Sequence, residues 1–165
     1  MVHTIQGVET IKRDVIRDLR GSVKHGLRTD EEWFISADNK IGEIYFSEVN
    51  PGIIKGWHLH TKMTLRYLCV SGRATIFLYD ERFGGITFGT PMKIELAADG
   101  PHYVLLTIPP YIWNAFRAKE GSVNSAIICN IASIPHDPDE IIRTPLEALL
   151  NFPLSLGEYN KEISE

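Results

Sequence analysis

The sequence predicts an all-β protein, an antiparallel barrel followed by a short C-terminal helical segment. Turn-forming Gly, Pro, Asn or Asp residues recur about every eight to twelve positions, which is typical of sandwiches and barrels. The segments between these turns are short and rich in β-branched and aromatic residues, the composition of strands. Only the tail, residues 138–150, has apolar residues at helical spacing.

The predicted strands follow one another along the middle of the chain. They are residues 43–49, 54–60, 66–70, 74–79, 92–96, 104–108 and 125–131. Turns are expected at Gly72 and over 80–85, 98–101 and 119–121. In the tail, the apolar stripe of the predicted helix consists of Ile141, Ile142, Leu146, Leu149 and Leu150. We expect a single domain over residues 1–165, with the barrel core at about residues 41–132.

Composition excludes several classes of function. The chain has 165 residues and a formal net charge of −4, with no run of Lys or Arg that would follow a nucleic acid backbone. It shows neither a signal peptide nor an apolar run of transmembrane length, so we expect a cytoplasmic protein without a membrane partner. Cys69 and Cys129 lie in apolar stretches, which favours two buried reduced thiols over a disulfide.

The most informative segment is residues 55–60, which contains two histidines separated by one residue. On a strand, His58 and His60 project from the same face, about 7 Å apart, whereas Trp57 and Leu59 project from the other. Two imidazoles so placed can hold a metal ion or abstract a proton. The alternative is a pair of solvated surface histidines.

This spacing resembles the two-part motif of the cupins, whose fold is a double-stranded β-helix, or jelly-roll barrel. In the first part, His58 and His60 match the two histidines, but Leu65 stands where the motif has a glutamate. In the second part, Asn114 replaces the remaining histidine and Tyr111 replaces a glycine. Two imidazoles without a carboxylate bind a divalent metal poorly. We therefore expect a cupin that uses no metal or other cofactor, with a metal-dependent cupin as an alternative.

Further segments in the same order resemble the dTDP-4-dehydrorhamnose 3,5-epimerase family, metal-independent cupins that act on nucleotide-linked 4-keto sugars. They are residues 18–21, 49–58 and 80–82, followed by 87–89. The resemblance covers about residues 11–132. It implies a nucleotide-linked sugar as substrate and a homodimer as the assembly.

The resemblance also implies roles for individual residues. His58 matches the general base that removes the proton beside the ketone. Lys55 falls where the family has an arginine that contacts the diphosphate, and Arg20 would bind phosphate as well, from the same or the partner subunit. Glu43 replaces a glutamine of the site, and Ser47 lies where a site serine is usual.

Departures from the family pattern leave two roles open. The family's enolate-stabilising lysine aligns with Leu65, so His60 and the adjacent Arg66 become the candidates for charge stabilisation. The family's proton-donating tyrosine aligns with Cys129 in a gapless count, which leaves the acid unidentified. The candidates for this acid are Tyr45, Tyr67, Tyr103, Tyr111 and Cys129. We count Tyr45, Tyr111, Asn114 and Cys129 among the candidate substrate-binding residues.

Two alternative functions remain open. The 3,4-ketoisomerases of dTDP-4-keto-6-deoxyglucose are related cupins that share the His-x-His pair, residues 108–110 (Ile-Pro-Pro) and a later tryptophan, here Trp113. A barrel that binds a sugar nucleotide without converting it is the alternative from another class. Trp113 can stack on a base or belong to the core. The acidic segment 137–140 can start a helix or supply a carboxylate that orients His58.

Overall fold

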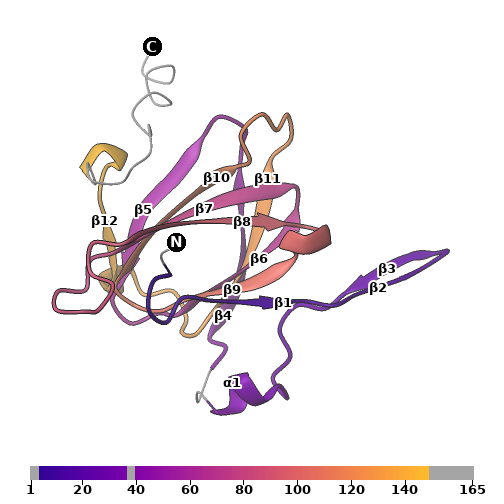
Figure 1. Cartoon of the computed structure of the whole chain (residues 1–165), viewed down its shortest axis with the longest axis horizontal. Helices are drawn as coiled ribbons and strands as arrows, with labels where there is room; N and C mark the ends of the chain where they lie inside the picture. The colour runs from indigo at the N-terminus through magenta and orange to yellow at the C-terminus, as the bar shows by residue number, and fades with distance from the viewer. Residues whose placement is uncertain (1–3, 37–39, 149–165) are drawn as a thin grey trace.

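Two five-stranded antiparallel sheets pack face to face in the computed structural model, which describes residues 4–36 and 40–148 (Figure 1). Sheet I has the order β1 (Glu9–Lys12), β9 (Val104–Ile108), β6 (Leu65–Ser71), β11 (Ala126–Ala132) and β4 (Glu43–Val49). Sheet II has the order β12 (Ile141–Arg143), β5 (Ile54–His60), β10 (Ile112–Ala118), β7 (Arg73–Asp80) and β8 (Pro91–Ala97). This is the jelly-roll barrel of the cupins, as the sequence predicted.

A separate hairpin extends away from the barrel (Figure 1). It pairs β2 (Val15–Asp18) with β3 (Gly21–Lys24), and α1 (Glu32–Ser36) follows it in the chain. The other elements of the described residues are three short 3₁₀ helices: η1 (Gly100–His102), η2 (Pro138–Glu140) and η3 (Leu146–Ala148). None of the helices within residues 4–36 and 40–148 is long and apolar enough to cross a membrane.

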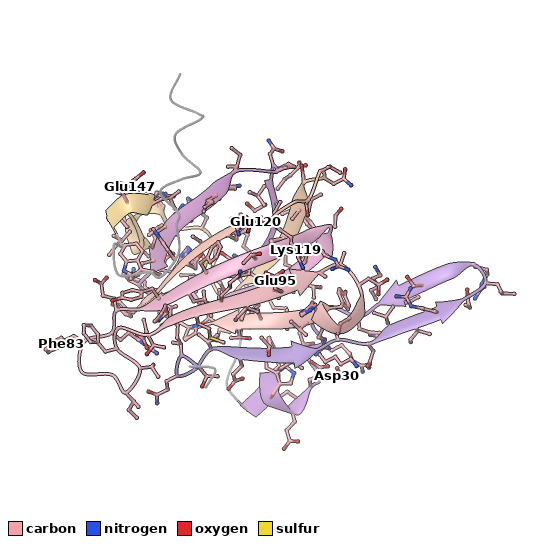
Figure 2. The ribbon with its side chains drawn as sticks, turned by 45° about the horizontal axis from the view of Figure 1, so that its top comes forward. Asp30, Phe83, Glu95, Lys119, Glu120 and Glu147 are labelled. Atoms are coloured by element: carbon pink, nitrogen blue, oxygen red, sulfur yellow. The ribbon has the colours of Figure 1, made fainter. Side chains whose placement is uncertain are left out.

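Strand alternation divides the apolar residues between three clusters. The largest lies between the sheets and includes Leu65, Ile76 and Leu106, all completely or almost completely buried. A second cluster covers the outer face of sheet II, and a third covers the outer face of sheet I, where Trp33 from α1 packs. Elsewhere on the outside of sheet II the face is polar: Glu95 of β8 lies 3.6 Å from the Lys119 ammonium (Figure 2).

All seven predicted strands are present, with ends that differ by at most one residue. The sequence pattern did not predict β1, β2, β3 and β12, and it indicated β10 only as part of a motif. The cysteines are both free and buried, which confirms the prediction of two thiols.

The predicted C-terminal helical segment is confirmed only in part. Residues 138–140 and 146–148 form 3₁₀ turns, but β12 lies between them and pairs with β5. Backbone pairing with the sheet edge therefore prevails over the helical spacing of Ile141, Ile142 and Leu146. Leu149 and Leu150 lie outside the described residues. Since β12 and β1 join the sheets, the sheets extend beyond the expected core of residues 41–132.

An irregularity in β5 decides which of its side chains face the space between the sheets. In its pairing with β10, His58 lies opposite Asn114 but Lys55 lies opposite Phe116, so three steps along β5 match two along β10. This extra residue shifts the alternation by one position. Lys55 therefore faces the same side as His58, although strict alternation would place it on the opposite side.

Gly56 lies within this irregularity, and the close approach of β10 requires a glycine there. Its φ is +146°, and an added Cβ would lie 2.4 Å from the Cβ of Ala115 and 2.7 Å from its Cα. No side chain fits at such distances without moving one strand.

We expect Gly56→Ala to lower the free energy of unfolding by about 2 kcal/mol or more, because the methyl group collides with β10. The matched control is Gly52→Ala. Gly52 also has a positive φ, +77°, but open space around it, so its alanine variant should lose only about 1 kcal/mol from backbone strain. Urea unfolding measures both, and equal losses would contradict the role of close packing at Gly56.

Candidate active site

A cavity of about 330 Å³ lies between the two sheets, a volume within the range of small-molecule sites. Sheet I contributes Glu43, Tyr45, Ser47, Tyr67, Ile128 and Asn130. Sheet II contributes Lys55, His58, His60, Phe116, Ile141 and Arg143, and His136 lies between the last two strands of the chain. The cavity thus brings together seven of the candidate site residues that the sequence singled out: Glu43, Tyr45, Ser47, Lys55, His58, His60 and Tyr67.

The imidazole of His60 forms a hydrogen bond with a buried carboxylate. Its Nδ1 contacts Oε1 of Glu140, which is completely buried. The other carboxylate oxygen accepts hydrogen bonds from the amides of Lys62 (3.1 Å) and Met63 (3.2 Å). Burial alone would raise the pKa of Glu140, but the bonds from His60 and these amides outweigh it and hold the pKa below its usual value. The carboxylate therefore stays ionised beside the ring.

His58 has the opposite environment. It is partly buried, and Arg143 of β12 lies directly opposite it in the strand pairing. Burial, followed by the positive charges of Arg143 and Lys55 and the neighbouring His60, lowers the pKa of His58 to about 4. His58 is therefore a neutral imidazole at physiological pH.

Two tyrosines form the wall of the cavity on sheet I. The Tyr45 oxygen accepts a 2.7 Å hydrogen bond from the side-chain amide of Asn130, which leaves its own proton available for the cavity. Tyr67 instead donates to the amide oxygen of Asn114 at 3.1 Å, and Asn114 donates to the backbone carbonyl of His58 at 2.9 Å. Asn114 is thus a buried link between the sheets behind the cavity.

The ammonium of Lys55 also joins the two sheets. It donates to the Ser47 hydroxyl at 2.7 Å and to the backbone carbonyl of Glu48 at 3.1 Å, both on β4. It also lies 5.8 Å from the ring centre of Phe116. An ammonium has three donors, so Lys55 can offer one more to an anion in the cavity.

Arg66 cannot stabilise an enolate in this cavity. Tyr67 faces the cavity, so alternation turns its neighbour Arg66 to the outer face of sheet I. There its guanidinium donates to the backbone carbonyls of Lys40 and Ile131 and lies 5.4 Å from the ring centre of Phe34 in α1. The prediction for Arg66 is therefore wrong.

Cys129 and Tyr103 also lie away from the cavity, in the cluster on the outside of sheet I. The neighbour of Cys129 on β11, Asn130, faces inward instead. Tyr111 is half exposed in the turn before β10, where its φ of +63° explains why the cupin motif has a glycine. Trp113 belongs to the cluster outside sheet II, and its indole N–H donates to Glu81. These four residues are therefore not candidates for direct contact with a ligand in the cavity.

Arg20 lies at the turn of the β2–β3 hairpin, and its side chain is 91% exposed. It donates to the carboxylate of Asp18. The hairpin extends away from the barrel (Figure 1), so Arg20 does not reach the cavity of its own chain.

Sequence reasoning did not assign Arg143, Asn130, His136 or Glu140 to the site. Asn130 follows Cys129 on β11 and faces the opposite side of the sheet, so an alignment shifted by one residue would have placed Asn130 in the site. The acidic segment 137–140 was noted as a source of a carboxylate, but the expected partner was His58 rather than His60. Arg143 depends on β12, which no sequence pattern predicted. Among residues 4–36 and 40–148, no group of three or more His, Cys, Asp or Glu side chains converges as a metal site would require.

Comparisons with known proteins identify relatives along nearly the whole chain, although no protein-family model matches it. The chain is 33% identical to a dTDP sugar isomerase from Desulfovibrio desulfuricans G20, with a TM-score of 0.82, over 92% of this chain and 91% of that one. The chain belongs to the dTDP-4-dehydrorhamnose 3,5-epimerase family.

Other members of this group are more distant. A probable low-salt glycan biosynthesis epimerase from Haloferax volcanii is 29% identical over 82% of this chain and 85% of its own length. The dTDP-4-dehydrorhamnose 3,5-epimerase from Sulfolobus tokodaii has the same fold, with a TM-score of 0.76 and 20% identity over 93% of this chain and 85% of that one. The chain is thus a divergent member of the family, and its homologues are sugar epimerases and isomerases.

The low pKa of His58 predicts how stability depends on pH. Above the ordinary histidine pKa of 6.5 both native and unfolded chains hold His58 neutral. Between pH 6.5 and 4 only the unfolded chain gains this proton, so the native state loses stability as the pH falls.

Wild type should therefore lose more stability than His58→Asn when the pH falls from 7 to 4.5. The expected excess is on the order of 1 kcal/mol, after allowance for solvent screening. Urea unfolding at both pH values measures it. His102→Asn, which replaces an exposed histidine, is the control. An equal pH dependence of wild type and His58→Asn would contradict the neutral state of His58.

Proposed function

We propose that the protein is a metal-independent nucleotide-sugar epimerase that acts beside the 4-keto group of a dTDP-4-keto-6-deoxyhexose or a similar sugar nucleotide. One observation carries the proposal: the histidine pair of β5 faces the cavity from sheet II, and Tyr45 faces it from sheet I. A proton acceptor and a proton donor thus line opposite walls. The relatives among sugar epimerases and isomerases support the same reaction class.

Epimerisation requires groups on both faces of the sugar. A base removes the proton from the carbon beside the ketone, and the electron pair of that bond moves toward the keto oxygen to give an enolate. A donor near the oxygen stabilises the negative charge. Return of a proton from the opposite face inverts the carbon.

Tyr45 is the proposed acid on the opposite wall. Burial raises the pKa of its phenol, opposed by the hydrogen bond from Asn130 and assisted by the charges of Glu43 and Glu140, so it remains protonated at neutral pH. Its oxygen already accepts a hydrogen bond from Asn130, which orients the hydroxyl. Of the four tyrosines considered from the sequence, Tyr45 and Tyr67 line the cavity, and the Tyr67 hydroxyl donates to Asn114.

Binding of the nucleotide is assigned to the cationic side of the cavity. Lys55 and Arg143 both line it and can neutralise a diphosphate. Glu43 and Ser47 lie on the same wall as Tyr45, where Ser47 holds Lys55 and Glu43 accepts a hydrogen bond from the backbone amide of His136. These two residues would shape the polar edge of the site.

A 3,4-ketoisomerase is the second candidate. Both histidines project from one wall of the cavity, which suits a proton removed and returned on the same face of the sugar. Tyr45 on the other wall favours epimerisation instead. A barrel that binds the sugar nucleotide without converting it is an outcome of the following experiment.

We expect the protein to exchange sugar protons with solvent when it is incubated with dTDP-4-keto-6-deoxyglucose in deuterated water. Deuterium at C3 and C5, followed by NMR, indicates a two-centre epimerase, and deuterium at C3 alone indicates a single-centre epimerase. A ketoisomerase would instead give a product with its carbonyl at C3 and a new C–H or C–D bond at C4. The control is the double variant His58→Asn/His60→Asn, which should lose exchange by at least about 10²-fold. Binding of the substrate without exchange would contradict an enzymatic function with this substrate and support the binding barrel.

The β2–β3 hairpin supports a homodimer as part of the proposed function. An isolated two-stranded hairpin is only marginally stable in water. In the hairpin, Ile16 and Val23 are 59% and 62% exposed, and Arg20 lies at the tip, away from its own cavity. A second copy would cover these apolar side chains and bring Arg20 toward a nucleotide.

Val23→Asp should convert the dimer to a monomer, because a carboxylate would be buried in the contact between copies. Light scattering coupled to size-exclusion chromatography measures the mass. The matched control is Val123→Asp on the β10–β11 loop, where Val123 is 87% exposed, and this variant should remain dimeric. A wild-type protein with the mass of one chain would exclude the dimer.

A further inference from the structure

The two histidines of β5 face the same cavity but have different partners. His60 contacts the carboxylate of Glu140, whereas His58 lies opposite the guanidinium-bearing Arg143. An imidazole that accepts a proton becomes positively charged, so its neighbours determine how easily it serves as a base. Because their partners differ, His58 and His60 can be assigned separate roles.

The position of His60 suits a proton acceptor. Its Nδ1 is held by Glu140, and among the described residues Nε2 has no hydrogen-bond partner, which leaves that nitrogen for the cavity that His60 lines. Glu140 is itself held by the amides of Lys62 and Met63. The ring is thus fixed in orientation by an ionised, completely buried carboxylate.

The position of His58 suits a hydrogen-bond donor instead. A proton on His58 would add a positive charge beside Arg143 and near Lys55, and these charges lower its pKa further after the effect of burial. The ring therefore remains neutral, and a neutral imidazole still carries one N–H. Such a ring can polarise a carbonyl oxygen without becoming charged.

We propose that His60, positioned by Glu140, is the catalytic base of this enzyme and that His58 donates a hydrogen bond to the keto oxygen of the substrate. The proposal rests on the proposed function. Nε2 of His60 forms a bond to the proton beside the ketone, the C–H electron pair forms the carbon–carbon double bond of the enolate, and the carbonyl electron pair moves to the oxygen beside His58. In an epimerisation, Tyr45 supplies a proton to the same carbon from the opposite wall. In a ketoisomerisation, His60 returns the proton to the former keto carbon, the neighbouring hydroxyl gives its proton to the enolate oxygen, and the carbon of that hydroxyl becomes the new ketone.

This assignment exchanges the roles that the family resemblance predicts for His58 and His60. The charged and titratable groups around His60 support it. Glu140 of η2 is in contact with the ring, Tyr45 and Tyr67 of sheet I are protonated at neutral pH because burial raises the pKa of each, and His58 is neutral. The remaining charges of the cavity are Glu43, Lys55, Arg143 and, when it is protonated, His136. Among these charged groups of the described residues, Glu140 is in direct contact with the His60 ring.

Asparagine variants separate the two roles, because asparagine retains an N–H donor but does not accept a proton at neutral pH. His60→Asn should reduce the rate of deuterium exchange beside the ketone by about 10²–10⁴-fold. His58→Asn should reduce it by only about tenfold, because the amide replaces the donor. His102→Asn, at an exposed position outside the cavity, is the control and should not change the rate. A larger loss in His58→Asn, or equal losses, would overturn the assignment.

Glu140→Gln tests the positioning role through the separation of kcat from KM. Glutamine removes the negative charge opposite the imidazolium that forms when the base accepts a proton, so kcat should fall by at least about tenfold while KM changes little. A rise in KM with kcat unchanged would show a merely structural role and overturn the proposal. If Glu140→Gln does not fold, the asparagine variants still decide between the two histidines.

Failure of this proposal differs from failure of the proposed function. Wild-type protein that exchanges no proton with dTDP-4-keto-6-deoxyglucose or another 4-keto sugar nucleotide removes the proposed function and the base assignment together. Wild-type exchange with the larger loss in His58→Asn removes only the assignment of the base to His60. Binding of dTDP, measured by calorimetry, should persist in both asparagine variants and shows that each retains a folded cavity.

Discussion

The close contact of Gly56 with Ala115 is the constraint on which the candidate active site depends. At this point β5 contains one residue more than the strand beside it, and only a glycine allows the two backbones to approach so closely. The extra residue turns Lys55 to the same side as His58, so a cation and an imidazole meet in one cavity. A regular strand would direct the lysine to the apolar cluster outside sheet II, where an ammonium would be buried without a counter-charge.

Polar contacts between the sheets position the functional groups once the strand faces are set. Lys55 bonds to Ser47 across the barrel, and Asn114 connects the Tyr67 hydroxyl to the backbone carbonyl of His58. Each contact satisfies a donor that would otherwise be buried, and each joins a residue of sheet I to one of sheet II. The polar groups behind the cavity therefore also keep its two walls at a defined separation.

Charge is distributed unevenly within the cavity, and this gives chemically similar groups different properties. The region near Arg143 and Lys55 disfavours a protonated imidazole at His58, whereas the carboxylate of Glu140 contacts Nδ1 of the His60 ring. Two histidines separated by a single residue can therefore carry out different steps of one reaction. The sequence resemblance assigns the base by its position in a motif. The charges around each histidine ring, however, come from β12 and η2, which lie near the end of the described chain.

The sequence by itself determined the strand pattern, the inward-facing histidine pair and the family. Side-chain alternation along a strand and turn-forming residues are local features, so a short stretch of sequence is enough to reveal them. Arg66 and Cys129 show the limit of this reasoning, because each was chosen by its place in an alignment. Tyr67 and Asn130 face the cavity, so their neighbours Arg66 and Cys129 face outward. The resemblance already named Lys55 as a site residue, but only the tertiary structure shows the register shift that turns it into the cavity. Only the tertiary structure paired Glu140 with His60 rather than His58 and brought Arg143 beside the site. These outcomes depend on a register shift and on pairing between segments about 80 residues apart, which no local pattern encodes.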